Sequence, residues 1–430
     1  MDTLRFEAVC SSWNRAAMHK WADELPPELL GLIVKKLAPN FMDILRFEAV
    51  CSSWNRAARW YTSTAALTPQ CPWLMLPTLK LHGRWSKPRS DGDVKGICFF
   101  SLAENKDYKM DWKASQGFAV DVDSFPGSSH DGWLVCNSSH GWLVMLEVVG
   151  SMLFHEIRGI RLFNPISRKS KTLPPLRQGV SSIRKVVLSS DPSRNNNFVV
   201  VIHDATSRST RLTFYQHGRG EENAAAGAWT DLEDSHGHYG GYCDIQLLNN
   251  GHYLFALSFD HSIEVWDFGD TYNNHPAKIL RFRPSIDIDR NVLSCMMSDT
   301  KWLLESMGEL LLVEMEFLGQ HCRGAELFYV YKLNIAAKKW EKVGSLRDCA
   351  LFLDSHGSAM SLSTAKLPEL EENSIYFADS YQEYSCSSFN DIHVRGVFSL
   401  ETKRVKQYYT TAAHANARYA PGLWILPTPW

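Results

Sequence analysis

One hairpin pattern recurs six times along the chain and constrains its fold more than any other feature. Each copy consists of an aromatic-rich strand, a polar turn and a second strand that carries Lys or Trp. The copies begin at residues 99, 161, 212, 264, 329 and 396, so successive starts lie 62, 51, 52, 65 and 67 residues apart. Recurrence at such an interval indicates one supersecondary unit repeated along the chain.

A further apolar strand pair precedes most of these hairpins, as in GWLVML (141–146), NFVVVIH (197–203) and NSIYFAD (373–379). Two hairpins per interval amount to four strands, which is the size of a β-propeller blade, about 50 residues for a kelch-type repeat. Residues 71–430 would then hold six or seven blades. Several stacked β-sandwiches are the alternative. The regular spacing favours the propeller, because each blade of a ring buries its faces against two neighbours only.

The two ends of this β-rich region suggest how the ring closes. PWLMLP (72–77) and LWILPTP (423–429) are both short, apolar and bounded by proline. We expect them to pair as strands of one blade, because a ring closed in this way leaves no open sheet edge.

Composition narrows the possible functions. The 45 Lys and Arg against 47 Asp and Glu give a formal net charge of −2, so no basic surplus favours nucleic acid as a partner. No apolar run is long enough to span a membrane. The ten cysteines are scattered singly without a CxxC, which indicates reduced thiols in a cytoplasmic or nuclear protein. Charged residues among the first seven positions argue against a secretory signal.

The segment before the β-rich region predicts three short helices. In WADELPPELLGLIVKKL (21–37), Asp23 or Glu24 can cap a helix whose first turn holds the two prolines, and Leu29, Leu32, Ile33 and Leu37 share one face. MDILRFEAV (42–50), with Asp43 helping to cap it, and SSWNRAARW (52–60) follow. Three helices in about 40 residues are at the lower limit of independent folding. We therefore expect a partner or the adjoining domain to complete this unit.

Residues Leu25 to Ala58 resemble an F-box, whose usual pattern is LPxELLxxIL, a DLLR-like turn and VCKxWRxLA. The resemblance implies docking onto the Skp-type adaptor, and through it the cullin, of a Skp–cullin–F-box ubiquitin ligase. Ser52 stands where a basic residue is usual, which puts one rim contact in doubt. Helical periodicity alone leaves equally open that these helices pack on the downstream domain. The docking face implied by the resemblance comprises Leu25, Pro26, Glu28, Leu29, Ile33, Leu37, Leu45, Val50, Cys51 and Trp54.

The remainder of the chain is similar to plant F-box proteins with a C-terminal kelch-like, KIB-type β-propeller. PWLMLP, SSHGWLV, LFNPISRKSKTLPPL and GVFSLETK are among the matching stretches, which run in order over nearly all of residues 72–430. This resemblance implies the fold and leaves the bound protein unidentified, because such domains have diverse targets.

The chain opens with a near-copy of part of the F-box-like segment. Residues 1–17 match residues 42–58 at sixteen of seventeen positions, with Thr3 in place of Ile44. No LPPELL helix precedes the first copy, so residues 1–20 are expected to be a disordered or non-functional partial duplicate, left by duplication or by a wrong gene start. The alternative is that this copy competes with the second one for the helix that begins near Leu25.

Histidines in Ser–His–Gly-like contexts are the main candidates for chemistry. His130, His140, His236, His238 and His356, with Cys243, could be read as metal ligands or bases. The spacing favours turns instead, in which Gly supplies a positive φ, and the loop around residues 236–243 offers no fourth metal ligand. We expect no metal, no cofactor and no catalytic residue, with Cys51 an apolar docking residue rather than a nucleophile.

Together these features predict an α+β multidomain protein. It would contain a three-helix F-box (21–58), a linker (59–70) packed through Trp60 and Tyr61, and an all-β propeller (71–430). The predicted function is a non-catalytic, substrate-recruiting subunit of a ubiquitin ligase, with the propeller binding an unknown protein. A scaffold that sequesters its partner without a ligase is one alternative. An enzyme with its site in the propeller channel is the other.

Overall fold

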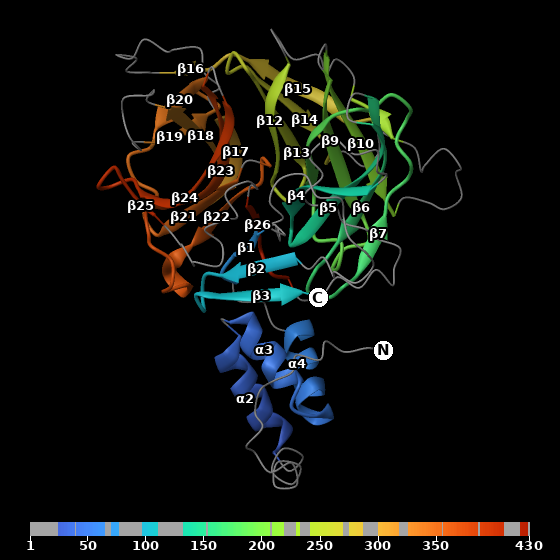
Figure 1. Cartoon of the computed structure of the whole chain (residues 1–430), viewed down its shortest axis with the longest axis vertical. Coiled ribbons are helices and arrows are strands. Elements are labelled where there is room, and N and C mark those ends of the chain that lie inside the picture. Colours follow the sequence, from blue (N-terminus) through green and yellow to red (C-terminus); the bar gives the residue numbers. More distant parts are fainter. Residues whose placement is uncertain are drawn as a thin grey trace. The chain divides into compact units, whose positions relative to one another are not determined.

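The computed structural model forms two compact units, one helical and ending at Gln70, the other all-β and spanning Cys71–Thr428. Three helices followed by a six-bladed propeller match the α+β architecture expected from the sequence (Figure 1). The partial duplicate at residues 1–20 lies outside the described residues. The structure describes residues 25–38, 40–64, 70–76, 97–110, 132–151, 154–206, 209–218, 229–232, 241–269, 275–286, 300–317, 326–354, 356–385, 388–407 and 422–428.

The helical unit consists of α2 (Pro27–Leu37), α3 (Phe41–Glu48) and α4 (Ser52–Thr64). Helix α2 begins with Pro27 at its first position, where the missing N–H costs nothing. The cap of α3 is Asn40, whose side-chain oxygen accepts a hydrogen bond from the Met42 N–H at 3.0 Å. Asp43, expected to help cap this helix, lies one turn further on and pairs with Arg46 at 2.7 Å.

Helix α4 is longer than the sequence pattern indicated. It continues to Thr64, so residues 59–64 of the expected linker are helical. Tyr61 packs against the core of the helical unit, whereas Trp60 is 65 % exposed. The expectation that Trp60 and Tyr61 pack the join between the two units stays a prediction.

Each propeller blade is a sheet of four or five strands. The first three sheets, in spatial order from the inner to the outer strand, are β26 (Leu423–Ile425), β1 (Trp73–Leu76), β2 (Ile97–Ser101) and β3 (Lys106–Met110); β4 (Gly132–Ser139), β5 (Trp142–Ser151), β6 (Phe154–Phe163) and β7 (Ser170–Thr172); and β8 (Ile183–Leu188), β9 (Phe198–Thr206), β10 (Ser209–His217) and β11 (Thr230–Asp231).

The fourth sheet follows the same order, and the last two each add a fifth strand. They comprise β12 (Tyr242–Leu248), β13 (Tyr253–Ser258), β14 (Ile263–Asp267) and β15 (Ala277–Phe282); β17 (Thr300–Ser306), β18 (Glu309–Phe317), β19 (Glu326–Asn334), β20 (Lys339–Lys342) and β16 (Ser285–Ile286); and β22 (Ala359–Ser363), β21 (Cys349–Asp354), β23 (Ser374–Ser385), β24 (Ser388–Ser399) and β25 (Arg404–Gln407), with a short 3-10 helix η2 (Thr364–Lys366) after β22.

The six hairpins found in the sequence correspond to equivalent strand pairs of the six sheets. They are β2–β3, β6–β7, β10–β11, β14–β15, β19–β20 and β24–β25. The apolar stretches upstream of them form β5, β9, β13, β18 and β23, which lie one strand further in. The repeat interval therefore measures one blade, and the number of blades is six.

The predicted ring closure is confirmed. Strand β1 pairs antiparallel with β26, with Trp73 opposite Ile425, Leu74 opposite Trp424 and Met75 opposite Leu423. The first sheet thus takes its inner strand from the other end of the propeller sequence (Figure 1).

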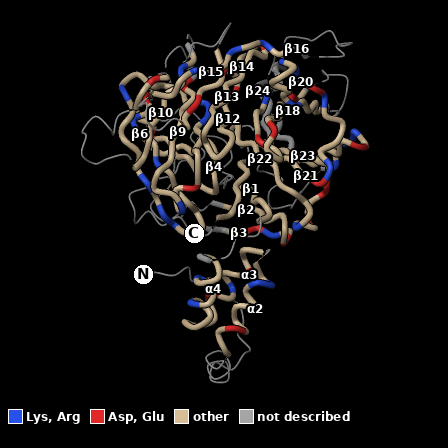
Figure 2. The backbone as a smooth tube through the Cα atoms, turned by 180° about the vertical axis from the view of Figure 1, so that it is seen from behind, with Lys and Arg blue, Asp and Glu red and all other residues tan. Residues whose placement is uncertain are grey.

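The propeller core lies between neighbouring sheets. In β21 all six residues are buried: Leu351 and Leu353 join a cluster with the fifth sheet, whereas Ala350 and Phe352 join one with the first sheet. A strand covered on both faces reads as a continuous apolar run. In Figure 2 acidic and basic segments are interspersed around the rim of the propeller.

Candidate docking surface

The helical unit has a small core of its own. Leu30, Val34 and Ala38 of the α2 segment pack with Ile44, Phe47 and Ala58, and each of these side chains is at most 3 % exposed. The stripe that α2 turns inward is therefore displaced by one residue from the Leu29–Leu32–Ile33–Leu37 face noted in the sequence. The Leu29–Leu32–Ile33–Leu37 face lies at the border of the core, and the Leu30–Val34–Ala38 stripe lies at its centre.

A set of large apolar side chains on the helical unit lies in contact with solvent. Leu29 is 46 % exposed, Leu32 60 % and Val50 42 %. Exposed large apolar side chains that share a face, as Leu29 and Leu32 do three residues apart on α2, are characteristic of interaction sites. We refer to Leu29, Leu32 and Val50 as the exposed apolar set.

The ten residues predicted to dock the adaptor are all solvent-accessible to some degree. Leu25, Ile33, Leu37 and Trp54 also pack against the helical core, so they support the unit as well as bordering its surface. The adaptor-docking role of the ten remains a prediction. Among them, Pro26, Glu28, Leu29 and Val50 are exposed, and Leu25, Ile33, Leu37, Leu45, Cys51 and Trp54 are half-buried.

Trp54 has a clear structural role. Its ring lies 4.3 Å from the Phe47 ring, centroid to centroid, and links α4 to α3. Such an aromatic pair stabilises a small core by more than the area it buries. Truncation of Trp54 would therefore disturb the fold of the helical unit along with any surface it presents.

Two features of this unit were not assigned from the sequence. Leu32, the most exposed of the apolar set, was left out of the docking residues, although the helical spacing had placed it on the same face.

Burial raises the pKa of the Glu48 carboxyl to about 7, while the charge of Arg59 lowers it. Glu48 Oε1 is buried and has no hydrogen-bond partner among the described residues. No sequence pattern signals this, because burial depends on helix packing.

The histidine-containing motifs form turns where the structure describes them. His140 and Gly141 have φ values of 50° and 79° and join β4 to β5 in a two-residue turn, the geometry that favours glycine. Gly357, with φ of 79°, follows His356 in the turn between β21 and β22. His130, His236 and His238 lie outside the described residues. Within the part of the chain described, no group of three or more His, Cys, Asp or Glu side chains could hold a metal ion.

Three of the described cysteines are poor nucleophiles. Burial raises the pKa of the Cys71, Cys136 and Cys243 thiols to about 12, so they stay protonated at neutral pH. The six cysteines that the structure describes form no disulfide.

Among the described helices, none has both the length and the apolar character needed to cross a membrane.

The family of the chain follows from a comparison with known protein families. A model described as the KIB1-4 beta-propeller matches residues 99–399, which hold most of the six sheets. The chain belongs to the KIB1-4 beta-propeller family. The resemblance of this KIB1-4 propeller protein to plant F-box proteins with a KIB-type propeller is confirmed, because its curated relatives are F-box proteins of Arabidopsis thaliana.

The relatives of this KIB1-4 propeller protein are distant. F-box only protein 7 of Arabidopsis thaliana is 24 % identical over 198 residues, which cover 44 % of this chain and 43 % of that protein. "Putative F-box protein At5g55150" from the same plant is 26 % identical over 262 residues, covering 60 % of this chain and 64 % of that protein. The matched part thus spans less than two thirds of the length of either relative.

Solved structures add little to the description of this KIB1-4 propeller protein. An exo-beta-1,3-galactanase from Phanerochaete chrysosporium aligns with a TM-score of 0.31 and 9 % identity, covering 68 % of this chain and 65 % of that chain. A similarity this low has no bearing on function.

Proposed function

We propose that this protein is a substrate-recruiting, non-catalytic subunit of a Skp–cullin–F-box ubiquitin ligase. In this proposal the helical unit binds the Skp-type adaptor, and the propeller binds a protein to be ubiquitinated. The observation that carries it is the exposed apolar set Leu29, Leu32 and Val50, which lies beside a core that is already complete. The F-box names of the relatives support the same assignment.

The energetics are compatible with a stable complex. Full burial of one large aliphatic side chain contributes roughly 1.5–3 kcal/mol. The three exposed side chains, together with the half-buried Leu25, Leu45 and Cys51, could offset an association cost of about 4–15 kcal/mol. The adaptor would cover apolar side chains that the helical unit leaves in water.

The propeller suits the recruiting half of the proposal. Its turns bring side chains from six sheets to a common face, and such clustered loops are frequent binding sites. The protonated thiols of Cys71, Cys136 and Cys243 fit a non-catalytic role. The proposed setting is the cytoplasm or the nucleus, where the thiols remain reduced.

Capture of a purified plant Skp-type adaptor by the full chain tests the proposal. We expect Leu29→Asp to lower the affinity at least about tenfold, because it places a charge in the apolar contact. Leu134→Asp is the matched control, since it makes the same change at a similarly exposed leucine of the propeller (41 %). Trp54→Ala is unsuitable as a docking variant because it removes the contact with Phe47.

Two results would contradict the proposal. The first is that the wild-type chain captures no adaptor. The second is that Leu29→Asp and Leu134→Asp bind the adaptor equally well. Circular dichroism of each variant shows that the helices are retained.

A further inference from the structure

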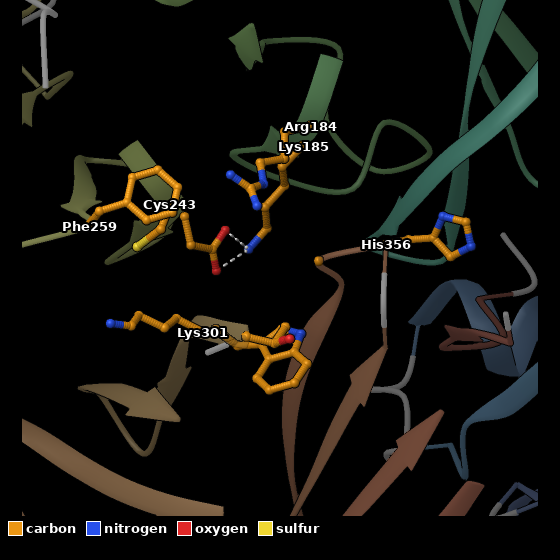
Figure 3. Close-up of a pocket in the computed structure, with 10 residues that line it drawn as sticks. Arg184, Lys185, Cys243, Phe259, Lys301 and His356 are labelled. Atoms are coloured by element: carbon orange, nitrogen blue, oxygen red, sulfur yellow. Dashed lines mark hydrogen bonds and ion pairs between the residues drawn. The ribbon is translucent and has the colours of Figure 1, made fainter. Parts of the chain in front are cut away.

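A cavity of about 360 Å³ opens where the inner strands of three neighbouring sheets begin. Arg184, Cys243 and Lys301 each occupy the second position of their strand, β8, β12 and β17, and line the cavity from three sides. Phe259, from the turn after β13, completes the wall beside Cys243 (Figure 3). Three neighbouring sheets therefore line one site inside the propeller, and the β21–β22 turn of the sixth sheet also borders it.

Two of the charged residues at this cavity are neutralised within the protein. Lys185 Nζ donates to both carboxylate oxygens of Asp244, at 2.8 and 3.0 Å. The same carboxylate accepts the Ile245 and Leu303 N–H groups at 2.8 and 2.7 Å. Both side chains are only 4 % exposed, so this pair joins the third, fourth and fifth sheets.

Lys301 is also paired. Its Nζ lies 3.2 Å from Glu314 Oε1, and that oxygen lies 2.7 Å from His261 Nε2. The pKa of Glu314 is lowered by its hydrogen bond to His261 and by the charge of Lys301, against the opposing effect of burial. Glu314 is therefore ionised at neutral pH and balances the charge of Lys301. His356 also borders the cavity, but its ring points away from these residues (Figure 3).

Arg184 differs from Lys185 and Lys301, which are both paired with a carboxylate. Its side chain is exposed, and among the described residues no carboxylate lies within 4.0 Å of it. The guanidinium lies over the Phe259 ring, 5.6 Å from its centroid, and Phe259 is itself 43 % exposed. An arginine that stacks on an aromatic face still presents its N–H fork at the edge, in the geometry that binds a carboxylate through two parallel hydrogen bonds. The cavity thus combines one uncompensated positive charge with an exposed apolar ring.

We propose that this cavity binds an acidic side chain of the recruited protein, with an adjacent large apolar residue of the same peptide packing on Phe259. The assignment rests on the proposed recruiting function, for which it specifies the recognised segment. Arg184 supplies the charge that attracts the carboxylate, and the neutralised Lys185–Asp244 pair forms the floor without competing for it. A free carboxylic acid with an apolar body has the same chemistry, so the experiment distinguishes the two sources.

Panning of a phage-displayed library of random seven-residue peptides on the full chain tests this proposal. We expect the enriched sequences to carry Asp or Glu next to an aromatic or long aliphatic residue. The most enriched sequence is then synthesised with a fluorescent label and titrated by polarisation. Arg184→Glu should weaken its binding at least about tenfold, since a charge-assisted pair becomes a repulsive one. Phe259→Ala should reduce the preference for the apolar neighbour.

The controls separate this proposal from the adaptor proposal. Arg404→Glu makes the same charge change at an exposed position of β25, on the outer edge of the sixth sheet, and should leave peptide binding unchanged. Arg184→Glu should still capture the adaptor, and Leu29→Asp should still bind the peptide. Enrichment without acidic residues, or equal binding by Arg184→Glu, would overturn the assignment. Binding of 3-phenylpropionate without any enriched acidic peptide would overturn it in favour of a free acid.

Discussion

His203 shows how one buried side chain can set the response of the propeller to acid. It is fully buried, and neither ring nitrogen has a hydrogen-bond partner among the described residues. Burial, with the charges of Arg184 and Lys185, lowers its pKa from 6.5 to about 3. The imidazole is therefore neutral in the folded protein at any pH above about 3.

This shift predicts a pH-dependent loss of stability. Below pH 6.5 the unfolded chain binds a proton at His203 that the folded chain does not, so the free energy of unfolding falls by about 1.4 kcal/mol per pH unit towards pH 3. His203→Phe removes this contribution. We expect its stability advantage over the wild type, measured by urea denaturation, to grow as the pH is lowered from 6.5 to 4.5.

The exposed His155 provides the control for this prediction. His155→Phe makes the same substitution at this exposed position, so it reports the effect of replacing a histidine with phenylalanine outside the core. Glu48 and Asp354 have raised pKa values, so their contribution to stability rises as the pH falls, opposite to that of His203. The informative quantity is therefore the difference in stability between each variant and the wild type at the same pH. A His203→Phe advantage that stays constant with pH would show that the histidine is protonated in the folded state.

Helix α2 shows what residue-level pattern can and cannot predict. Its period of 3.6 was evident in the sequence, and the helix forms where expected. The stripe containing Leu30 and Val34 and the stripe containing Leu29 and Leu32 both fit that period, however, and only packing against α3 and α4 determines which one is buried. The sequence therefore predicted an amphipathic helix but could not distinguish its buried stripe from its exposed one.

At the level of elements, buried polar side chains of β4, β12 and β21 join neighbouring sheets. Asn137 of β4 accepts the Val186 N–H at 3.1 Å and donates to its carbonyl at 2.8 Å. Asp244 of β12 accepts the Leu303 N–H, and Asp354 of β21 accepts the Trp424 N–H at 3.0 Å. Because the partners are some 50 to 70 residues apart in the sequence, no local pattern predicted these joints.

The joint at Asp354 is expected to stabilise the closed ring. This fully buried carboxylate also accepts the His356 and Ser358 N–H groups, both at 3.0 Å. Burial raises its pKa to about 7, although the three N–H groups act in the opposite direction. Asp354→Asn replaces one acceptor oxygen with a donor, so we expect a loss of about 1–3 kcal/mol in the free energy of unfolding, measured by chemical denaturation.

Asp267→Asn is the comparison for this variant. Asp267 Oδ1 accepts the Gly269 N–H at 2.7 Å in a half-buried turn, where water can compensate for a change of acceptor. Equal losses in the two variants would mean that Asp354 contributes no more than an ordinary turn residue.

At the level of the whole molecule, the repeating hairpins predicted the architecture. Aromatic strands followed by polar turns mark the outer strands of each sheet, which are partly solvated and keep a recognisable pattern. The number of blades stayed open between six and seven because the intervals vary from 51 to 67 residues. The cavity at Arg184 could not be predicted, since it depends on residues from four sheets that meet only when the ring closes.

Ring closure is testable by truncation. Removal of all residues after Tyr419 deletes β26, whose Leu423, Trp424 and Ile425 are at most 2 % exposed. Loss of their burial would cost roughly 5–9 kcal/mol, comparable with the whole stability of a typical domain. We expect the truncated chain to show no cooperative thermal unfolding by circular dichroism, whereas a chain ending at Thr428 should unfold like the wild type. An unchanged melting temperature after the first truncation would rule out this closure.

The pairing of β1 with β26 also governs how the protein can be made. Strands β1, β2 and β3 leave the ribosome before the other five sheets, but their inner neighbour β26 is translated only after all of those sheets. Until β26 is made, the edge of β1 leaves its backbone N–H and C=O groups without hydrogen-bond partners. A strand of another polypeptide could pair with this edge. We therefore expect chaperones to shield this edge during translation, and prematurely terminated products to be cleared by proteolysis.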